Sequence, residues 1–286
     1  QLLSGACQEI LPSASLQRRL QCTGHFVLTL LGQTLPRQVW DEEQQRVEIT
    51  LIRLLFHYRP SGWHLDVLAL LLRQLQTWRS HLPLHYLAQR EIVQGSCLLL
   101  APRAFFGKAQ EHLQRGLDLA LGMPSSGLRC GLLLDGCSQL LVVGHPHLER
   151  LLDTTVLQVE QLGDPAASIQ AHYLRGKFLR LCGRLSQSKQ ALERALAIAV
   201  ETQNIFERER IQLQLQLVEA LSGHPVELST CPPRECGLQR QWQLVMAYSH
   251  WSRGETQQAR RLARQSQGAE RGDPLLRADQ ALLQLL

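Results

Sequence analysis

The stretch of sequence that decides the fold spans residues 170–200 and reads QAHYLRGKFLRLCGRLSQSKQALERALAIAV. Its apolar residues recur every three to four positions on either side of Gly183, which is the spacing of amphipathic helices. Gly183 interrupts this pattern, so the stretch predicts two helices joined by a short turn. Because so short a connection leaves consecutive helices antiparallel, we expect a helical hairpin.

The small side chains of this stretch fall where two packed helices need room. Gly176 and Ser188 are small where the helices have to approach closely, and Ala195 is small where the second helix meets the next hairpin. Residues 240–272 carry small side chains at the same offsets. These residues are Ala247, Gly254, Ala259, Ala263 and Ser266. The sequence therefore predicts more than one hairpin of the same kind.

Fainter copies of the pattern precede the two clear ones. In the first, the positions of the second helix are taken by Ala109, Leu113 and Gly116. In the next, the corresponding hairpin positions are taken by Gly136, Leu148, Leu152 and Thr155. Equivalent positions then recur about every 40 residues, as in stacked helical units.

Composition extends this prediction to the whole chain of 286 residues, which is longer than one compact core usually holds. Leu, Gln, Arg and Ala favour helices and are abundant, whereas aromatic residues, which are typical of sheets, make up only 5%. The periodicity predicts an all-α protein of about thirteen helices. We expect them at residues 15–31, 37–58, 63–80, 84–100, 104–121, 127–143, 147–162, 166–182, 185–201, 205–221, 238–253, 255–267 and 274–286.

The small-residue positions of residues 170–200 resemble those of the tetratricopeptide repeat, whose standard length is 34 residues. The longer period of about 40 residues is similar to the divergent repeats of large cell-division proteins, such as separase, the cohesin-loader scaffold subunit and a subunit of the anaphase-promoting complex. Two positions depart from the repeat: His172 replaces a large aromatic residue, and Arg175 replaces a Leu. The resemblance implies a TPR-like α-solenoid, a right-handed superhelix of antiparallel helical hairpins.

The resemblance covers roughly residues 84–272, and we expect the chain to divide into four parts. Residues 1–83 form an N-terminal helical segment with at most degenerate repeats, and residues 84–222 hold TPR-like repeats. Residues 223–237 form a Pro-containing loop. Residues 238–286 hold a C-terminal repeat and a capping helix.

In the tetratricopeptide family, the first helix of each hairpin faces a concave groove that binds an extended peptide or a helix of another protein. Matched one position at a time, the resemblance implies eight partner-binding residues. They are Gln170, Tyr173, Lys177, Arg180, Gln241, Leu244, Tyr248 and Trp251. Tyr, Trp and Arg also dominate the binding energy of interfaces. The helical spacing of Tyr248 and Trp251 equally fits an alternative in which both belong to the core.

The chain has 30 Lys and Arg against 25 Asp and Glu, a net charge of +5 that is too small to indicate nucleic acid. Arg260, Arg261 and Arg264 nevertheless form a basic strip. An acidic or phosphorylated protein segment would suit this strip, whereas single-stranded nucleic acid would want aromatic residues between the charges. The alternative is a solvated helix face paired with Glu255 and Glu270.

No constellation of residues points to catalysis. Gly107 and Lys108 lack the upstream Gly of a phosphate-binding loop and fall inside a helical pattern. Residues 186–189 match a Ser-x-x-Lys string without its companion motifs. Glu111 and His112 lack the second His of a zinc-protease helix. We therefore expect no enzyme activity and no cofactor in these residues.

The eight cysteines are scattered through apolar helical stretches, so we expect buried free thiols rather than a disulfide framework. Cys130 and Cys137 fall on one face of a predicted helix, where small core residues are typical. Cys231 and Cys236, with His224 upstream, have a zinc-like spacing but lack a fourth ligand. Two surface-loop thiols explain this pair better, and no metal site is expected.

Location follows from what the sequence lacks. Residues 130–147 are the most membrane-like segment, but they include Asp135 and are shorter than the roughly 20 apolar residues that span a bilayer. No signal-peptide pattern is visible, so the sequence predicts an intracellular protein of the cytoplasm or nucleus. Gln1 in place of Met indicates that the sequence begins inside a longer chain.

These observations predict a non-enzymatic scaffold that binds another protein. The resemblance implies a role in the cell cycle, within a cell-division or chromosome-segregation complex. The alternative is the helical regulatory region of a larger enzyme, such as a separase-like protease, whose catalytic domain lies outside these residues. A protease or ATPase motif in adjoining sequence would favour the alternative.

Overall fold

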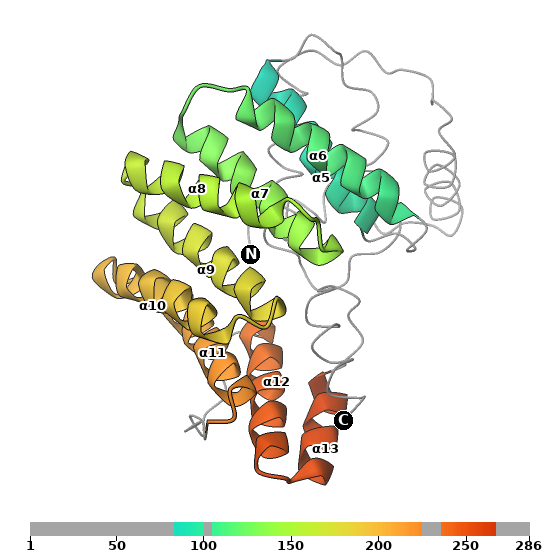
Figure 1. The fold of residues 1–286 in the computed structure, drawn as a ribbon, viewed down its shortest axis with the longest axis vertical. Helices are drawn as coiled ribbons and strands as arrows, with labels where there is room; N and C mark the ends of the chain where they lie inside the picture. Colours follow the sequence, from blue (N-terminus) through green and yellow to red (C-terminus); the bar gives the residue numbers. More distant parts are fainter. Residues whose placement is uncertain (1–82, 100–104, 225–235, 267–286) are drawn as a thin grey trace, which may run out of the picture. The chain divides into compact units, whose positions relative to one another are not determined.

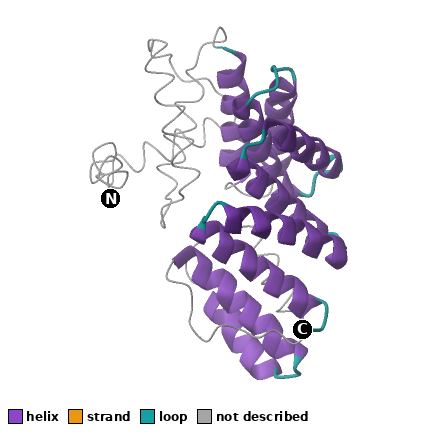
Figure 2. Ribbon diagram, turned by 90° about the vertical axis from the view of Figure 1, so that its left-hand side faces the viewer, coloured by secondary structure: helices purple, strands orange, loops and turns teal. Residues whose placement is uncertain are grey.

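The structure is a computed structural model that describes residues 83–99, 105–224 and 236–266 (Figure 1). The described part contains helices, turns and loops but no strand (Figure 2). Its nine helices are α5 (Leu84–Leu99), α6 (Phe106–Leu121), α7 (Gly127–Val143), α8 (Leu148–Leu162), α9 (Pro165–Leu181), α10 (Leu185–Glu201), α11 (Ile205–Leu221), α12 (Cys236–Ser252) and α13 (Thr256–Ser266). The all-α prediction is confirmed for these residues.

The helix ends agree closely with those predicted from the sequence. α7, α10 and α11 begin and end at the predicted residues, and the other described helices differ by one or two residues at either end. The predicted helices at residues 15–31, 37–58, 63–80 and 274–286 lie outside the described residues.

Side-chain caps explain several of these ends. The backbone N–H groups in the first turn of a helix have no partner within the helix, and short polar side chains can accept from them. Asp164 accepts from Ala166 N at 3.0 Å and caps α9, and Asn204 accepts from Glu207 N at 3.2 Å and caps α11. Ser126 caps α7 in the same way through Arg129 N. These three helices therefore begin where the local sequence provides an acceptor, whereas α8 and α10 begin without a side-chain cap.

Two equivalent glycines end the first helices of the clear hairpins. Gly183 follows α9 with φ +74, and Gly254 follows α12 with φ +79. These values lie in the left-handed region, which is costly for residues with a Cβ and free for glycine. The prediction that Gly183 terminates the first helix is confirmed.

The chain divides into two compact units, Gln1–Gly116 and Leu117–Leu286, and the boundary falls inside α6. In the described part of the first unit, α5 and α6 form a hairpin with very little space between them. A Cβ on Gly95 would stand 2.6 Å from Leu113 Cγ, and a Cβ on Gly116 would stand 2.7 Å from Ile92 Cγ1. Gly116 therefore faces α5 of its own hairpin.

In the second unit, consecutive helices from α7 to α13 pack in adjacent pairs, and α9 also contacts α7 and α11 (Figure 1). This order of packing is consistent with a helical repeat, in which each unit contacts mainly its neighbours. No helix of the described residues is long and apolar enough to cross a membrane.

The α9–α10 hairpin has the close approach that its small residues predict. A Cβ on Gly176 would stand 2.6 Å from Leu192 Cγ and 2.8 Å from Leu192 Cδ2. Ser188 is fully buried, and its hydroxyl donates to the Gly176 carbonyl oxygen at 2.8 Å. Gly176 and Ser188 are therefore small because a larger side chain would push the two helices apart, as predicted.

The equivalent position in the preceding copy has a different neighbour. The repeat period aligns Gly136 with Gly176, but a Cβ on Gly136 would stand 2.6 Å from Leu117 Cδ2 of α6. α7 is buried over most of its circumference, from Cys130 to Leu141. A helix covered on several sides has more than one close approach, so the sequence period does not reveal which neighbour the glycine meets.

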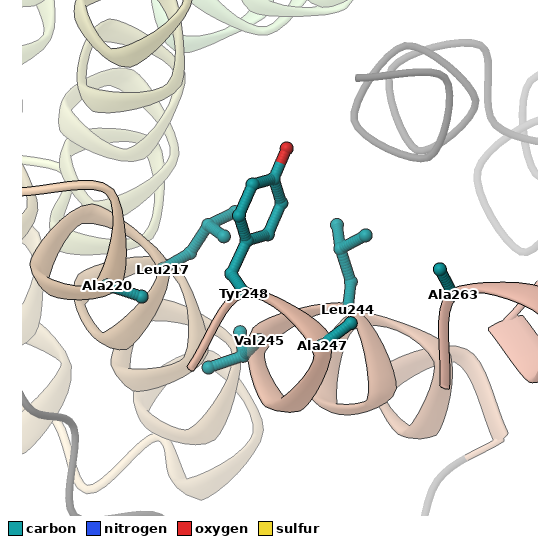
Figure 3. Close-up of a cluster of buried hydrophobic side chains, with 7 residues drawn as sticks. All are labelled: Leu217, Ala220, Leu244, Val245, Ala247, Tyr248 and Ala263. Carbon is teal, nitrogen blue, oxygen red and sulfur yellow. The ribbon is translucent and has the colours of Figure 1, made fainter. Parts of the chain in front are cut away.

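The C-terminal hairpin is joined to α11 by a cluster of buried apolar side chains (Figure 3). The cluster consists of Leu217, Ala220, Leu244, Val245, Ala247, Tyr248 and Ala263. Ala247, Ala259 and Ala263 are buried at the positions where the sequence predicts small residues. The side chain of Ser266 lies outside the described residues.

A histidine bridges α8 and α9. His172 is buried, and its Nε2 lies 3.1 Å from Glu160 Oε1. Burial lowers the pKa of His172 below its ordinary value of 6.5, because the Glu160 carboxylate only partly opposes the loss of hydration. The folded chain therefore binds a proton at this ring less readily than the unfolded chain.

We expect His172 to make the folded state less stable in mild acid. A pKa that is lowered by folding contributes stability that is present above the ordinary value of 6.5 and is lost as the pH falls below it. His172→Gln keeps a donor for Glu160 without a titrating ring, so its urea midpoint should fall less than that of the wild type between about pH 7.5 and pH 5.5. The exposed His224, replaced by Gln, is the control. If the urea midpoint falls equally with pH in the wild type and in His172→Gln, the prediction is contradicted.

Gly176→Leu should destabilise the α9–α10 hairpin. A leucine side chain there overlaps Leu192, and overpacking of this kind costs about 1–3 kcal/mol. Amide hydrogen exchange of α9 and α10, followed by mass spectrometry, should become faster by roughly 5-fold to 150-fold, the equivalent of that free energy.

Gly127→Leu is the matched control, because nothing lies within 4 Å of a Cβ on this first residue of α7. The same chemical change should leave exchange there unaffected or slower, since leucine favours helices more than glycine does. Equal effects at the two glycines would rule out close packing as the reason for Gly176.

Candidate partner-binding surface

α9 carries four of the predicted partner-binding residues, and they differ in how much surface they offer. Tyr173 is 3% exposed and Arg180 is 6% exposed, so both belong to the interior. Gln170 and Lys177 are half-buried. Of these four side chains, only those of Gln170 and Lys177 are partly open to solvent.

An arginine from the next hairpin covers Tyr173. The guanidinium carbon of Arg210, on α11, lies 4.0 Å from the centre of the Tyr173 ring. The same guanidinium donates to Gln170 Oε1 at 2.7 Å and pairs with Glu207. A cation over an aromatic face is attracted by the negative face of the ring. Arg210 is thus fixed between α9 and α11 by three side chains.

A second cation lies near the same ring. Lys177 Nζ is 5.6 Å from the centre of the Tyr173 ring. Glu207 already neutralises Arg210, whereas Lys177 makes no ion pair with any residue that the structure describes. Of the two cations beside the Tyr173 ring, Lys177 is therefore the one whose charge is not neutralised within the described part of the chain.

Exposed apolar side chains adjoin these cations at the start of α11. Phe206 is 42% exposed and its ring centre lies 6.0 Å from the guanidinium carbon of Arg210, and Ile205 beside it is also exposed. We call Gln170, Tyr173, Lys177, Phe206 and Arg210 the α9–α11 cluster. It combines an aromatic ring, an apolar neighbour and a free ammonium group, which are features of protein-binding surfaces.

The sequence does not predict Phe206 and Arg210 as partner-binding residues, although the repeat period points to Arg210. Arg210 follows Gln170 by 40 residues. Extending the sequence period of about 40 by one more hairpin would have placed Arg210 in register with Gln170. Nothing in the sequence distinguishes the exposed Phe206 from a core residue.

The four predicted residues on α12 have mixed positions. Leu244 and Tyr248 are buried in the apolar cluster that joins α11, α12 and α13 (Figure 3). Gln241 is half-buried, and Trp251 is exposed at the end of α12. The alternative that places Tyr248 in the core is confirmed, whereas Trp251 lies at the surface.

The predicted basic strip lies on α13. Arg260, Arg261 and Arg264 are all exposed, while Ala259 and Ala263 of the same helix are buried. Glu255 pairs with His250 of α12, so this carboxylate is engaged outside the strip. Glu270 lies outside the described residues.

α5 and α6 share a buried carboxylate. Glu91 Oε2 lies 2.8 Å from His112 Nδ1, Glu91 Oε1 lies 2.9 Å from a terminal nitrogen of Arg90, and Arg115 is nearby at 3.7 Å. Burial alone would raise the pKa of Glu91, but the hydrogen bonds from His112 and Arg90 outweigh it and lower this pKa below 4.5. Both oxygens of the carboxylate already have partners within the chain, and the contact with His112 links α5 to α6.

The described residues contain no group of three or more His, Cys, Asp or Glu side chains that could hold a metal ion. Among Cys231, Cys236 and His224, only His224 has a described side chain, and it is exposed. Cys231 and the side chain of Cys236 lie outside the described residues.

The cysteines of the described part differ from one another. Cys130 and Cys137 are free and buried in α7, as predicted. Burial raises the pKa of the Cys137 thiol to about 12, although a hydrogen bond with Thr155 acts in the opposite direction. Cys182 is free but exposed, so the prediction of buried thiols is wrong for this residue, which sits at the turn after α9 where the core ends.

Neither the models of known protein families nor the curated proteins compared with this sequence gave a match. The sequential packing of helix pairs is consistent with a helical repeat, and no family is identified.

Thiol labelling should separate the cysteines of α7 from Cys182. Cys182 is expected to react rapidly with N-ethylmaleimide in the native protein because it is exposed. Cys137 should react only after unfolding, since its thiol is buried and its pKa of about 12 leaves almost no thiolate at neutral pH. Peptide mass mapping before and after denaturation measures both rates. Similar rates for the two residues in the native protein would contradict this assignment.

Proposed function

We propose that this chain is a non-enzymatic scaffold that binds a segment of another protein across the α9–α11 cluster. In this proposal the helix pairs continue as a TPR-like right-handed superhelix, and the first helices of successive hairpins line its concave groove. The observation that carries the proposal is the exposed Phe206 beside two cations that are gathered around Tyr173.

The cluster would recognise its partner through two kinds of contact. An apolar side chain of the partner would cover Phe206 and Ile205, which are exposed in the free chain. A partner carboxylate would pair with Lys177, whose ammonium group makes no ion pair with a described residue. An extended or helical segment that combines apolar and acidic residues fits both contacts.

The arrangement of Arg210 favours binding because this side chain is already ordered. Gln170, Glu207 and the ring of Tyr173 hold its guanidinium group in one position. Binding then does not have to order the arginine, which lowers the entropic cost of association. The buried Tyr173 thus contributes by positioning Arg210 and Lys177.

Site-specific crosslinking tests whether a partner occupies the cluster. A photoreactive amino acid replaces Phe206 in one version of the full chain and Leu157, an exposed apolar residue of α8, in another. After illumination in cells, a protein adduct should form from position 206 and be absent or much weaker from position 157. No adduct at 206, or the same adducts from both positions, would reject the proposal.

Substitution of the surface residues provides the second test. Lys177→Glu combined with Phe206→Ala should weaken capture of the crosslinked partner by about tenfold or more, because it removes both contacts. Leu157→Ala combined with Arg194→Glu makes matched changes at exposed positions of α8 and α10. Circular dichroism confirms that both variants fold.

Tyr173 and Arg180 are poor choices for this test because both are buried. Removing either side chain would leave a cavity or an unpaired polar neighbour and would lower stability for reasons unrelated to a partner.

If the control pair reduces capture as much as the Lys177 and Phe206 pair, the cluster is not the binding surface.

A further inference from the structure

α13 has two chemically distinct faces. At about 100° per residue, Arg260, Arg261 and Arg264 fall within one sector of roughly 100° on this helix. Ala259 and Ala263, which are buried, fall on the opposite side. We call the three arginines the arginine face of α13. They are exposed, so the side of α13 turned away from the core is strongly cationic.

Two of the three arginines, Arg261 and Arg264, have no counterion among the described residues. α13 contains no Asp or Glu between Thr256 and Ser266. Arg261 and Arg264 make no ion pair with any residue in the described ranges, and Glu255, just before the helix, is held by His250. Like charges three and four residues apart lie on neighbouring positions of a helix and repel each other. An anion bound at this face would relieve that repulsion.

We infer that the arginine face of α13 is a second docking surface, which binds an acidic segment of a protein. Guanidinium groups hold carboxylates through two parallel hydrogen bonds, so adjacent arginines can grip successive Asp or Glu side chains. The surface lies on a different hairpin from the α9–α11 cluster and does not depend on the function proposed for that cluster.

The chemistry of α13 favours an acidic peptide over other polyanions. A helix that lies on a membrane buries an exposed apolar face in the lipid, but the apolar residues Ala259 and Ala263 are already covered by the protein. Single-stranded nucleic acid is bound by aromatic side chains between the charges, and α13 has none. Carboxylates need only the guanidinium groups that are present.

Fluorescence anisotropy with the full chain tests this inference. The probe is a short fluorescein-labelled peptide rich in Glu, and its control is the same peptide with every Glu replaced by Gln. The wild type should bind the Glu peptide, and added salt should weaken the binding because the charges are exposed. The Gln peptide should not bind.

Charge reversal locates the binding surface. Arg261→Glu with Arg264→Glu should weaken binding of the Glu peptide by about tenfold or more. Arg150→Glu with Arg194→Glu changes the net charge equally at exposed positions of α8 and α10 and should leave the affinity within about twofold of the wild type. If the double Glu variant fails to fold, Arg261→Gln with Arg264→Gln removes the charges more gently and should still weaken binding.

The other outcomes would overturn the inference. Absence of binding by the wild type, or an equal loss in the control pair, shows that no local acidic-peptide site exists on α13. Tighter binding of an oligonucleotide or of anionic vesicles through the same two arginines assigns the surface to a different class of partner. The Lys177→Glu and Phe206→Ala variant should bind the peptide like the wild type, so failure here is distinguishable from failure of the α9–α11 proposal.

Discussion

The packing of the described helices depends on close contact between backbones at positions without a bulky side chain. In both α5–α6 and α9–α10, a glycine of the first helix lies directly against a leucine of the second, and a Cβ on Gly95 or Gly176 would stand 2.6 Å from that leucine's Cγ. This contact sets the distance between the two helices and their register. The register in turn decides which side chains of α9 face the neighbouring hairpin, and so brings Gln170 and Tyr173 under Arg210.

Features that depend on local sequence were predictable, and features that depend on how a helix is rotated were not. Asp164, Asn204 and Gly183 fix helix ends through interactions within a few residues, which explains why the predicted helix ends hold to within two residues. The neighbours of Gly116 and Gly136 depend on tertiary packing. A repeat period gives the position of a residue along the array but not the side from which its neighbour approaches.

The candidate surface was predictable only in outline for the same reason. Helical periodicity puts Gln170, Tyr173, Lys177 and Arg180 on one face of α9, but this helix contacts α7, α8, α10 and α11, and their packing leaves Tyr173 and Arg180 inside. Long amphipathic side chains such as Arg and Tyr suit either environment. Contributions from a neighbouring hairpin, such as Phe206 and Arg210, require knowledge of which helices meet.

The sequential order of packing has a consequence for cooperativity. Because the described helices from α7 to α13 touch mainly the helices next to them in the chain, most of their contacts close short loops, and we expect ordering to begin at a hairpin and spread to its neighbours. The α9–α10 pair, joined by Gly176, Ser188 and Leu192, is well suited to act as such a nucleus. We therefore expect partly ordered chains, in which the outer described hairpins open while the middle ones persist, and a thermal transition that a single melting temperature does not describe.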